Sequence, residues 1–240
     1  MNYYDRRIDY YDVREEQQRS VTLLDLFVYI AVDPSGGSSA ETATSRTDKC
    51  GWTVCGVDVH DNRFIFEIGE RHLDDDQFVR HMYTLYEQYI PRYIGIEKTP
   101  HLLTHFRHVE KEKKMVLPII TLAPKGRKKA VRIRAAGTTL GRTYFLDNSV
   151  AENQRRFRGW YDEMEHGDDG IDSYAYLDDF AEAPTEQQLI AHKNEILKVL
   201  AEMYVKELPD QVKGEWAFVK KFTSATPNYD EDWNNFIEGR

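Results

Sequence analysis

Several hallmarks of secreted, membrane-spanning and ATP-hydrolysing proteins are missing from this sequence. Its two cysteines, Cys50 and Cys55, suit neither a disulfide framework nor a zinc knuckle, and they favour a reduced, intracellular protein. The charged opening MNYYDRRIDYYDVREEQQ is unlike a signal peptide. The longest apolar run, VTLLDLFVYIAV, falls short of the roughly 20 residues that cross a bilayer, so we expect no membrane partner. No G-x-x-x-x-G-K-[ST] pattern occurs, which excludes a P-loop.

The chain also lacks an overall positive charge. Its 240 residues carry a formal net charge of -9, which argues against a general nucleic-acid coat protein. A nuclease is not excluded, because a carboxylate cluster adds negative charge that bound metal neutralises. Ordinary hydrophobic content and high charge predict a soluble globular protein, with one large domain or one domain with appendages.

Apolar runs and turn signals predict a mixed α/β protein. We expect strands at Phe27–Val32, in GWTVCGVDV and RFIFEIGE around a turn at 60–62, in YIGIE and in VLPIITLA. Helices are expected near Asp74 and His101, in SVAENQRRFRGWYDEM, after GDDG and from Thr185, and a small edge strand follows the basic segment. Hairpin-joined strands followed by crossovers predict a mixed central β-sheet with helices on both faces.

We expect three segments along the chain. Residues 1–22 are polar and tyrosine-rich and indicate a linker or an amphipathic lead-in, residues 23–182 form the core, and residues 183–240 form a C-terminal helix and tail. The helix from Thr185 carries an apolar stripe, which first indicates a core-facing surface and second a face that docks a partner. Asp178 and Asp179 are expected to end an exposed helical turn.

Three short acidic stretches fall where a strand or helix should end. They are Asp33 in VYIAVDPSGG, Glu97 in YIGIEKT, and Asp168, Asp169 and Asp172 in HGDDGIDSYAYL. A carboxylate that ends a buried run is costly unless something cationic meets it, and hard divalent cations take oxygen ligands. If these groups converge, Asp33 would bridge two ions, while Glu97 and Asp168 or Asp169 would each hold one. Paired ions of this kind cleave phosphodiester bonds.

Each stretch also has a structural interpretation. A single Asp after a strand is usually a turn residue or a helix cap, and the late acids are typical of an N-cap and a first helical turn. Glu97 fits this interpretation less well, because the strand around it is otherwise apolar. The combination of the three stretches in this strand order favours the metal site.

Basic residues gather in one part of the chain. No acidic residue occurs from Lys113 to Phe145. A basic loop beside an acidic metal site would hold phosphates on either side of the cleaved bond, without reading the base sequence. The candidates for DNA contact are Arg127, Lys128, Lys129 and Arg132. A solvated face, or a contact with another acidic domain, is the alternative interpretation.

The succession AVDPSGG, TDKCGWTV, IGIEKT, KKAVRI and HGDDGIDSYAYL resembles the RNase H-like nuclease domain of the large terminase subunit of tailed phages, over roughly residues 29–180. The late motif has Ser173 where the family has Ala. The resemblance implies a Mg²⁺- or Mn²⁺-dependent endonuclease that cuts concatemeric double-stranded viral DNA during packaging. The metal ligands it implies are Asp33, Glu97, Asp168 and Asp169, with Asp172 as a further candidate.

The resemblance also implies partners and a location. The partners would be the terminase ATPase domain, the small terminase and the portal protein, in the host cytoplasm. Since no P-loop occurs, we expect the nuclease half of a terminase without its motor. Two alternatives stay open. One is a Holliday-junction resolvase or transposase-like nuclease of the same fold, and the other is a non-catalytic assembly module whose acids are structural.

Overall fold

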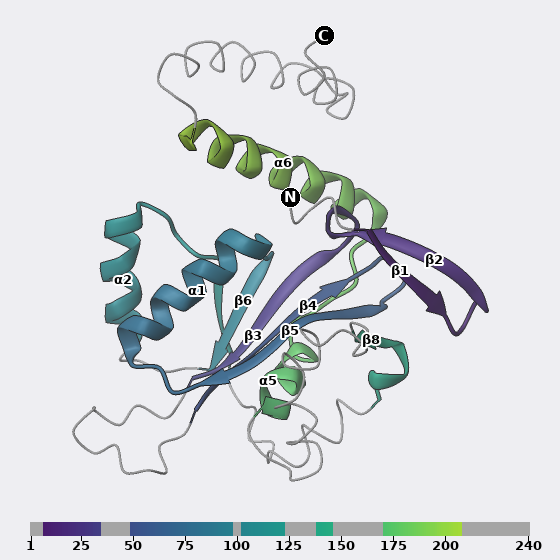
Figure 1. The fold of residues 1–240 in the computed structure, drawn as a ribbon, viewed down its shortest axis with the longest axis horizontal. Helices are drawn as coiled ribbons and strands as arrows, with labels where there is room; N and C mark the ends of the chain where they lie inside the picture. The colour runs from purple at the N-terminus through teal and green to yellow at the C-terminus, as the bar shows by residue number, and fades with distance from the viewer. Residues whose placement is uncertain (1–6, 35–48, 98–101, 123–137, 146–169, 208–240) are drawn as a thin grey trace. The chain divides into compact units, whose positions relative to one another are not determined.

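A computed structural model describes residues 7–34, 49–97, 102–122, 138–145 and 170–207 (Figure 1). The chain divides into two units, Met1–Leu189 and Ile190–Arg240. The first unit holds the sheet, and α6 (Glu186–Glu207) falls mainly in the second. The expected division into segments 1–22, 23–182 and 183–240 stays a prediction.

Six strands form the central sheet of the first unit. They are β3 (Phe27–Asp33), β4 (Cys50–Val57), β5 (Arg63–Arg71), β6 (Tyr93–Glu97), β7 (Ile119–Leu122) and β8 (Thr143–Phe145). Their order across the sheet is β7-β6-β3-β4-β5-β8. Among these six strands β4 alone runs antiparallel to its neighbours, while β6, β7 and β8 pair in parallel with theirs.

The turn between β4 and β5 forms where the sequence predicts it. The backbone N–H of Asp58 donates to the carbonyl of Asn62 at 3.1 Å, and Asp61 adopts a left-handed φ of 61°. The parallel strands need longer crossovers, and α1 (Asp75–Tyr89) and α2 (Leu102–Lys113) provide them. The small edge strand predicted after the basic segment is β8.

Helices cover both faces of the sheet, as Figure 1 shows for α1 and α2 against α5 (Gly170–Leu177). On one face the rings of Trp52 in β4 and His81 in α1 lie 4.4 Å apart. On the other, Tyr174 and Tyr176 of α5 share a buried cluster with Tyr29. Alternate residues of β3 point to opposite faces. The structure thus confirms the predicted fold class, a mixed central β-sheet with helices on both faces.

α1 begins and ends at local signals in the sequence. The Asp74 carboxylate accepts from the backbone N–H of Gln77 at 2.8 Å, while the Gln77 side chain accepts from the Asp74 backbone. This is a capping box. At the other end Ile90 takes a left-handed φ of 40°, directly before Pro91, which cannot continue a helix.

Residues 7–22, for which the polar composition suggests a linker or an amphipathic lead-in, have regular secondary structure. They form an antiparallel hairpin of β1 (Arg7–Asp12) and β2 (Gln17–Thr22). Tyr10 and Val21 are buried, and the Tyr10 ring meets that of Phe64 in β5 at 4.9 Å. Along β1, Ile8, Tyr10 and Asp12 are more buried than Arg7, Asp9 and Tyr11, so the strand has one buried and one solvated face.

Two further findings concern the described residues. Cys50 and Cys55 are both free and buried. No helix in the described part of the chain is long and apolar enough to cross a membrane.

Candidate metal centre

Three parallel strands finish together at one end of the sheet, here named the carboxyl end. Their last residues are Asp33 of β3, Glu97 of β6 and Leu122 of β7. Val32 is paired with Ile96, so Asp33 and Glu97 each follow this pair by one residue. Neighbouring strands lie about 4.8 Å apart. The structure thus brings two of the predicted ligands to adjacent positions.

Both carboxylates belong to the sheet face that α5 covers. Asp33 continues the alternation of Tyr29 and Ala31, which lie in the cluster with α5. Glu97 meets that helix directly, because the hydroxyl of Tyr176 donates to Glu97 Oε2 at 2.7 Å. Asp33 and Glu97 are both half-buried. Two acidic groups so placed form the start of a site rather than two separate surface charges.

The direction of α5 is set by its contacts with β3 and β4. Phe180, just beyond the C-terminal end of α5, meets the Tyr29 ring at 5.7 Å. Ser173, near the helix start, lies 2.7 Å from the hydroxyl of Thr53, and Thr53 is paired with Ala31. Going backwards along α5 therefore means going forwards along β3, so the helix starts toward the carboxyl end.

The late acids of the sequence motif precede this helix start or lie within it. Asp168 and Asp169 come directly before Gly170 and fall outside the described residues. Asp172 belongs to α5, but its side chain is also outside the described part. Their assignment as ligands stays a prediction.

Several polar contacts hold α5 on the sheet. Besides the Ser173–Thr53 contact, the hydroxyl of Tyr174 lies 3.1 Å from that of Thr139 and 2.9 Å from that of Thr143. Just after the helix, the carboxylate of Asp178 pairs with Arg63 of β5, whose side chain is 5% exposed. Gly95 of β6 adds close packing, because a Cβ there would lie 2.6 Å from the Phe180 ring.

Tyr29 and Tyr174, which lie on this face, stay protonated at ordinary pH. Burial raises the pKa of Tyr29 to about 12, and its hydroxyl donates to the carbonyl of Glu182 at 2.9 Å. Burial also raises the pKa of Tyr174.

The donor set fits a hard divalent cation as far as the structure describes it. Carboxylate oxygens are the ligands that Mg²⁺ and Mn²⁺ prefer. Within the described ranges, no group of three or more His, Cys, Asp and Glu residues could hold an ion. The described part thus supplies the pair Asp33 and Glu97, and further ligands would have to come from the remaining segments.

The predicted DNA-binding segment leaves the sheet at the same end. Leu122, which is paired with Glu97, is followed by the stretch that contains Arg127, Lys128, Lys129 and Arg132. These four residues fall outside the described ranges. Two basic residues at the borders of the segment pair with acids of the chain itself, namely Lys113 with Glu87 at 2.8 Å and Arg142 with Asp61.

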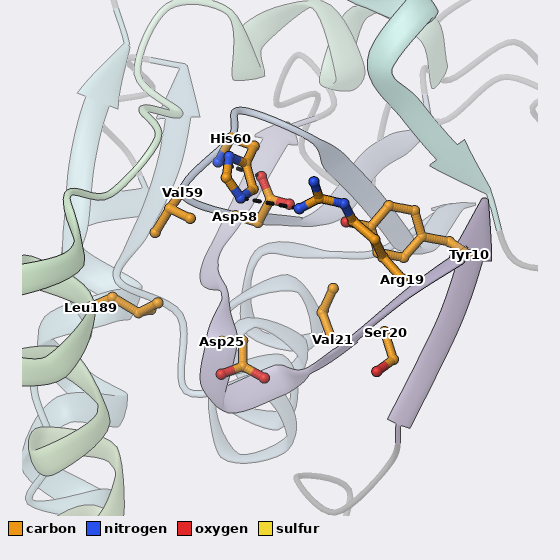
Figure 2. A pocket seen from close by; sticks show the side chains of 9 residues that line it. All are labelled: Tyr10, Arg19, Ser20, Val21, Asp25, Asp58, Val59, His60 and Leu189. Carbon is orange, nitrogen blue, oxygen red and sulfur yellow. Dashed lines mark hydrogen bonds between the residues drawn. The ribbon is translucent and has the colours of Figure 1, made fainter. Parts of the chain in front are cut away.

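A cavity of about 330 Å³ lies at the opposite end of β3, between the β1–β2 hairpin and the turn after β4 (Figure 2). Val57, the last residue of β4, is paired with Phe27, the first residue of β3, which places this turn far along the strand from Asp33. Arg19 and His60 approach each other at 3.3 Å across the cavity.

The acids beside this cavity serve the fold. The Asp58 carboxylate accepts from the backbone N–H groups of His60 and Asn62, both at 2.8 Å, and from the Asn62 side chain at 2.9 Å. Arg19 also pairs with Asp12 at 3.2 Å. These contacts stabilise the turn and the hairpin separately, and the Arg19–His60 contact joins the two.

Sequence reasoning did not find Tyr176 or the partner of Asp178. Asp178 does end an exposed turn, as predicted, yet its carboxylate meets a buried arginine. In the sequence, Tyr176 looks like any other aromatic residue of SYAYL. Only its position four residues after Asp172, one helical turn onward, connects it to the acidic motif. That spacing becomes informative once β6 is known to lie beside α5.

No protein-family model matches the chain, and no curated protein matches it either. The chain resembles the yeast mitochondrial Holliday junction resolvase, with a TM-score of 0.38 and 11% identity over 71% of this chain and 85% of that one. It also resembles the fowlpox virus Holliday junction resolvase, with a TM-score of 0.37 and 12% identity over 64% of this chain and 99% of that one. Similarity at this level supports no conclusion about activity.

Proposed function

We propose that this protein is a divalent-metal-dependent DNA endonuclease. The observation that carries the proposal is the placement of Asp33 and Glu97 at the adjacent ends of two parallel strands, on one face of the sheet. Two neighbouring carboxylates repel each other unless positive charge lies between them, and a bound divalent ion supplies that positive charge.

The proposed roles combine this pair with the late acids of the sequence motif. Asp33, Glu97 and one or both of Asp168 and Asp169 would hold Mg²⁺ or Mn²⁺, with Asp172 as a reserve candidate. Two such ions, when bound, activate a water molecule and stabilise the leaving oxygen of a phosphodiester. The protein's own part is to orient Glu97 through Tyr176 and to keep the α5 face apolar around the carboxylates.

The proposed substrate is double-stranded DNA. The basic segment continues from Leu122 at the carboxyl end, so Arg127, Lys128, Lys129 and Arg132 would contact phosphates near the acids. Phosphate contacts carry no base information, and we infer cleavage largely independent of sequence. The motif resemblance supports concatemeric viral DNA as the substrate, and an ATPase domain, a small terminase and a portal as partners, in the host cytoplasm.

A cleavage assay with three DNA substrates tests the proposal. The chain is incubated with supercoiled plasmid, linear duplex and a four-way junction, with Mn²⁺ or Mg²⁺ and with or without chelator. We expect metal-dependent cutting of plasmid and linear DNA. Intact DNA in every tube, at several pH values, would contradict the proposal, and cutting of the junction alone would favour a resolvase-like activity instead.

A single substitution connects the activity to the site. Asp33→Ala is expected to abolish cutting while circular dichroism shows an unchanged fold. An active variant would place the chemistry elsewhere. Calorimetry that detects no Mn²⁺ binding by the unmodified chain would favour the non-catalytic assembly module.

A further inference from the structure

Tyr176 is the described residue of α5 whose hydroxyl contacts a candidate ligand. It is 1% exposed, and its O–H donates to Glu97 Oε2 at 2.7 Å, from α5 across to β6. The neighbouring Tyr174 sends its hydroxyl to Thr139 and Thr143 instead. Two tyrosines of one helix thus make different contacts, and only one of these contacts involves the carboxylate pair.

This hydrogen bond restricts how Glu97 can present its oxygens. The terminal torsion of a glutamate is broad and roughly two-fold, so an unrestrained carboxylate rotates easily. An O–H donor at 2.7 Å to an ionised carboxylate makes a strong, charge-assisted bond. The Tyr176 side of the bond is buried while Glu97 is half-buried, and turning the carboxylate away from the phenol would break the bond.

We propose that Tyr176 is a positioning residue that holds Glu97 for coordination through a single oxygen, and so favours Mg²⁺ or Mn²⁺ over Ca²⁺. The inference rests on the proposed function. Ca²⁺ takes six to eight ligands and accepts bidentate carboxylates, whereas the smaller Mg²⁺ demands octahedral geometry. A carboxylate with Oε2 held by a phenol turns less readily to offer both oxygens to one ion.

The test compares two Tyr→Phe variants of the full chain. Tyr176→Phe removes the hydroxyl that meets Glu97, and Tyr174→Phe removes an equally buried hydroxyl from the same helix. Mn²⁺ and Ca²⁺ affinities are measured by titration calorimetry, below the melting temperature of the least stable variant. Loss of a hydrogen bond to a metal-ligating carboxylate costs roughly 10–100-fold in metal affinity.

We expect Tyr176→Phe to weaken Mn²⁺ binding roughly tenfold and to weaken Ca²⁺ binding less, so that the Mn²⁺-to-Ca²⁺ preference narrows. Tyr174→Phe should keep both affinities at the level of the unmodified chain, even if its melting temperature falls. The change in preference is informative because a loss of packing alone would lower the affinities for Mn²⁺ and Ca²⁺ by similar factors.

Two results would overturn the inference while the proposed nuclease stands. One is an unchanged Mn²⁺ affinity and ion preference in Tyr176→Phe, in a chain that binds Mn²⁺ and cuts DNA. The other is an equal loss in both variants, which would assign the effect to the position of α5. A chain that neither binds Mn²⁺ nor cuts DNA would overturn the proposed function and this inference together.

Discussion

Acidic side chains have different surroundings at the two ends of the central sheet. At the turn end, defined by the turn 58–62 and the start of β5, three carboxylates are matched within the chain. Asp58 accepts from Asn62, Asp61 pairs with Arg142, and Asp178 pairs with Arg63. At the carboxyl end, Asp33 and Glu97 follow the last pair of two neighbouring strands.

The comparison sets acids with fold-stabilising partners beside two acids that lie next to each other at strand ends. A carboxylate that accepts several hydrogen bonds or meets a guanidinium contributes to stability, whereas two adjacent carboxylates repel each other. Proteins keep such unfavourable groupings mainly at functional sites. The carboxyl end also holds an ion pair of Lys49 with Glu70, so the contrast concerns Asp33 and Glu97 in particular.

Alanine substitutions at Asp33 and Asp58 should give opposite results, and this is the largest expected effect. Asp33→Ala should lower the cleavage rate on the order of 10³-fold or more, because a carboxylate ligand of the proposed metal ions is lost, with a melting temperature near that of the unmodified chain. Asp58→Ala should cost about 1–3 kcal/mol of unfolding free energy, because buried donors lose their acceptor, and should still cut DNA.

Cleavage assays and urea unfolding on both variants check this pair of predictions. A marked loss of stability in Asp33→Ala with cutting retained would reverse the comparison, since that carboxylate would then serve the fold. Loss of cutting in a folded Asp58→Ala would extend the functional region to the turn end.

The neighbours Asp178 and Asp179 provide a matched test at the turn end. Asp178→Ala leaves the buried guanidinium of Arg63 without its carboxylate. Removing one partner of a fully buried pair costs about 3–5 kcal/mol, and we expect about 2–3 because the Asp178 side chain is 23% exposed. Asp179→Ala should change stability by less than about 0.5 kcal/mol. Equal effects in urea unfolding would show that the ion pair contributes no stability.

Local patterns predicted the central elements because those patterns are strong. The run YIGIE is apolar, bounded by Pro91 before it and a charged residue at its end, and β6 occupies these same residues. The order of strands and crossovers then indicated that Asp33 and Glu97 could be neighbours. The hairpin of residues 7–22 escaped prediction because its burial depends on Tyr10 meeting Phe64, more than fifty positions away.

The supporting contacts of the site were beyond sequence reasoning for the same reason. Tyr176 lies 79 positions from Glu97, and Asp178 lies 115 positions from Arg63. Neither separation produces a local pattern, since the contacts arise only after α5 packs on the sheet. Propensity and periodicity report short-range order, while pairing across layers depends on the assembled fold.

Ser173 stands where the terminase motif has Ala, and its contribution to stability can be measured together with that of its partner Thr53. Ser173 and Thr53 are both fully buried, and their hydroxyls lie 2.7 Å apart. Ser173→Ala alone should cost about 1–2 kcal/mol, because a buried hydroxyl loses a partner. Adding Thr53→Val should recover most of that loss, since replacing both partners with apolar groups is nearly neutral. A double variant as unstable as the sum of the single ones would mean that the two hydroxyls act independently.

His81 gives the smallest effect and tests the opposite face of the carboxyl end. Burial against Trp52 lowers the pKa of His81 below its ordinary 6.5, and Arg71 adds to the shift while Glu67 opposes it. The unfolded chain therefore binds the proton more readily, so this contribution to stability is complete above pH 6.5 and is lost as the pH falls toward the folded pKa.

Replacement of this histidine by glutamine should flatten the fall in unfolding free energy between pH 7.5 and pH 5.5 without changing Mn²⁺ affinity. Urea unfolding at both pH values, on the unmodified chain and on His81→Gln, measures the difference in slope, in which the other titrating groups cancel. Equal slopes would mean that His81 is as easily protonated in the folded chain as in the unfolded one. A change in Mn²⁺ affinity would mean that the two faces of the carboxyl end are coupled. The proposed metal site would then depend on α1 as well as on α5.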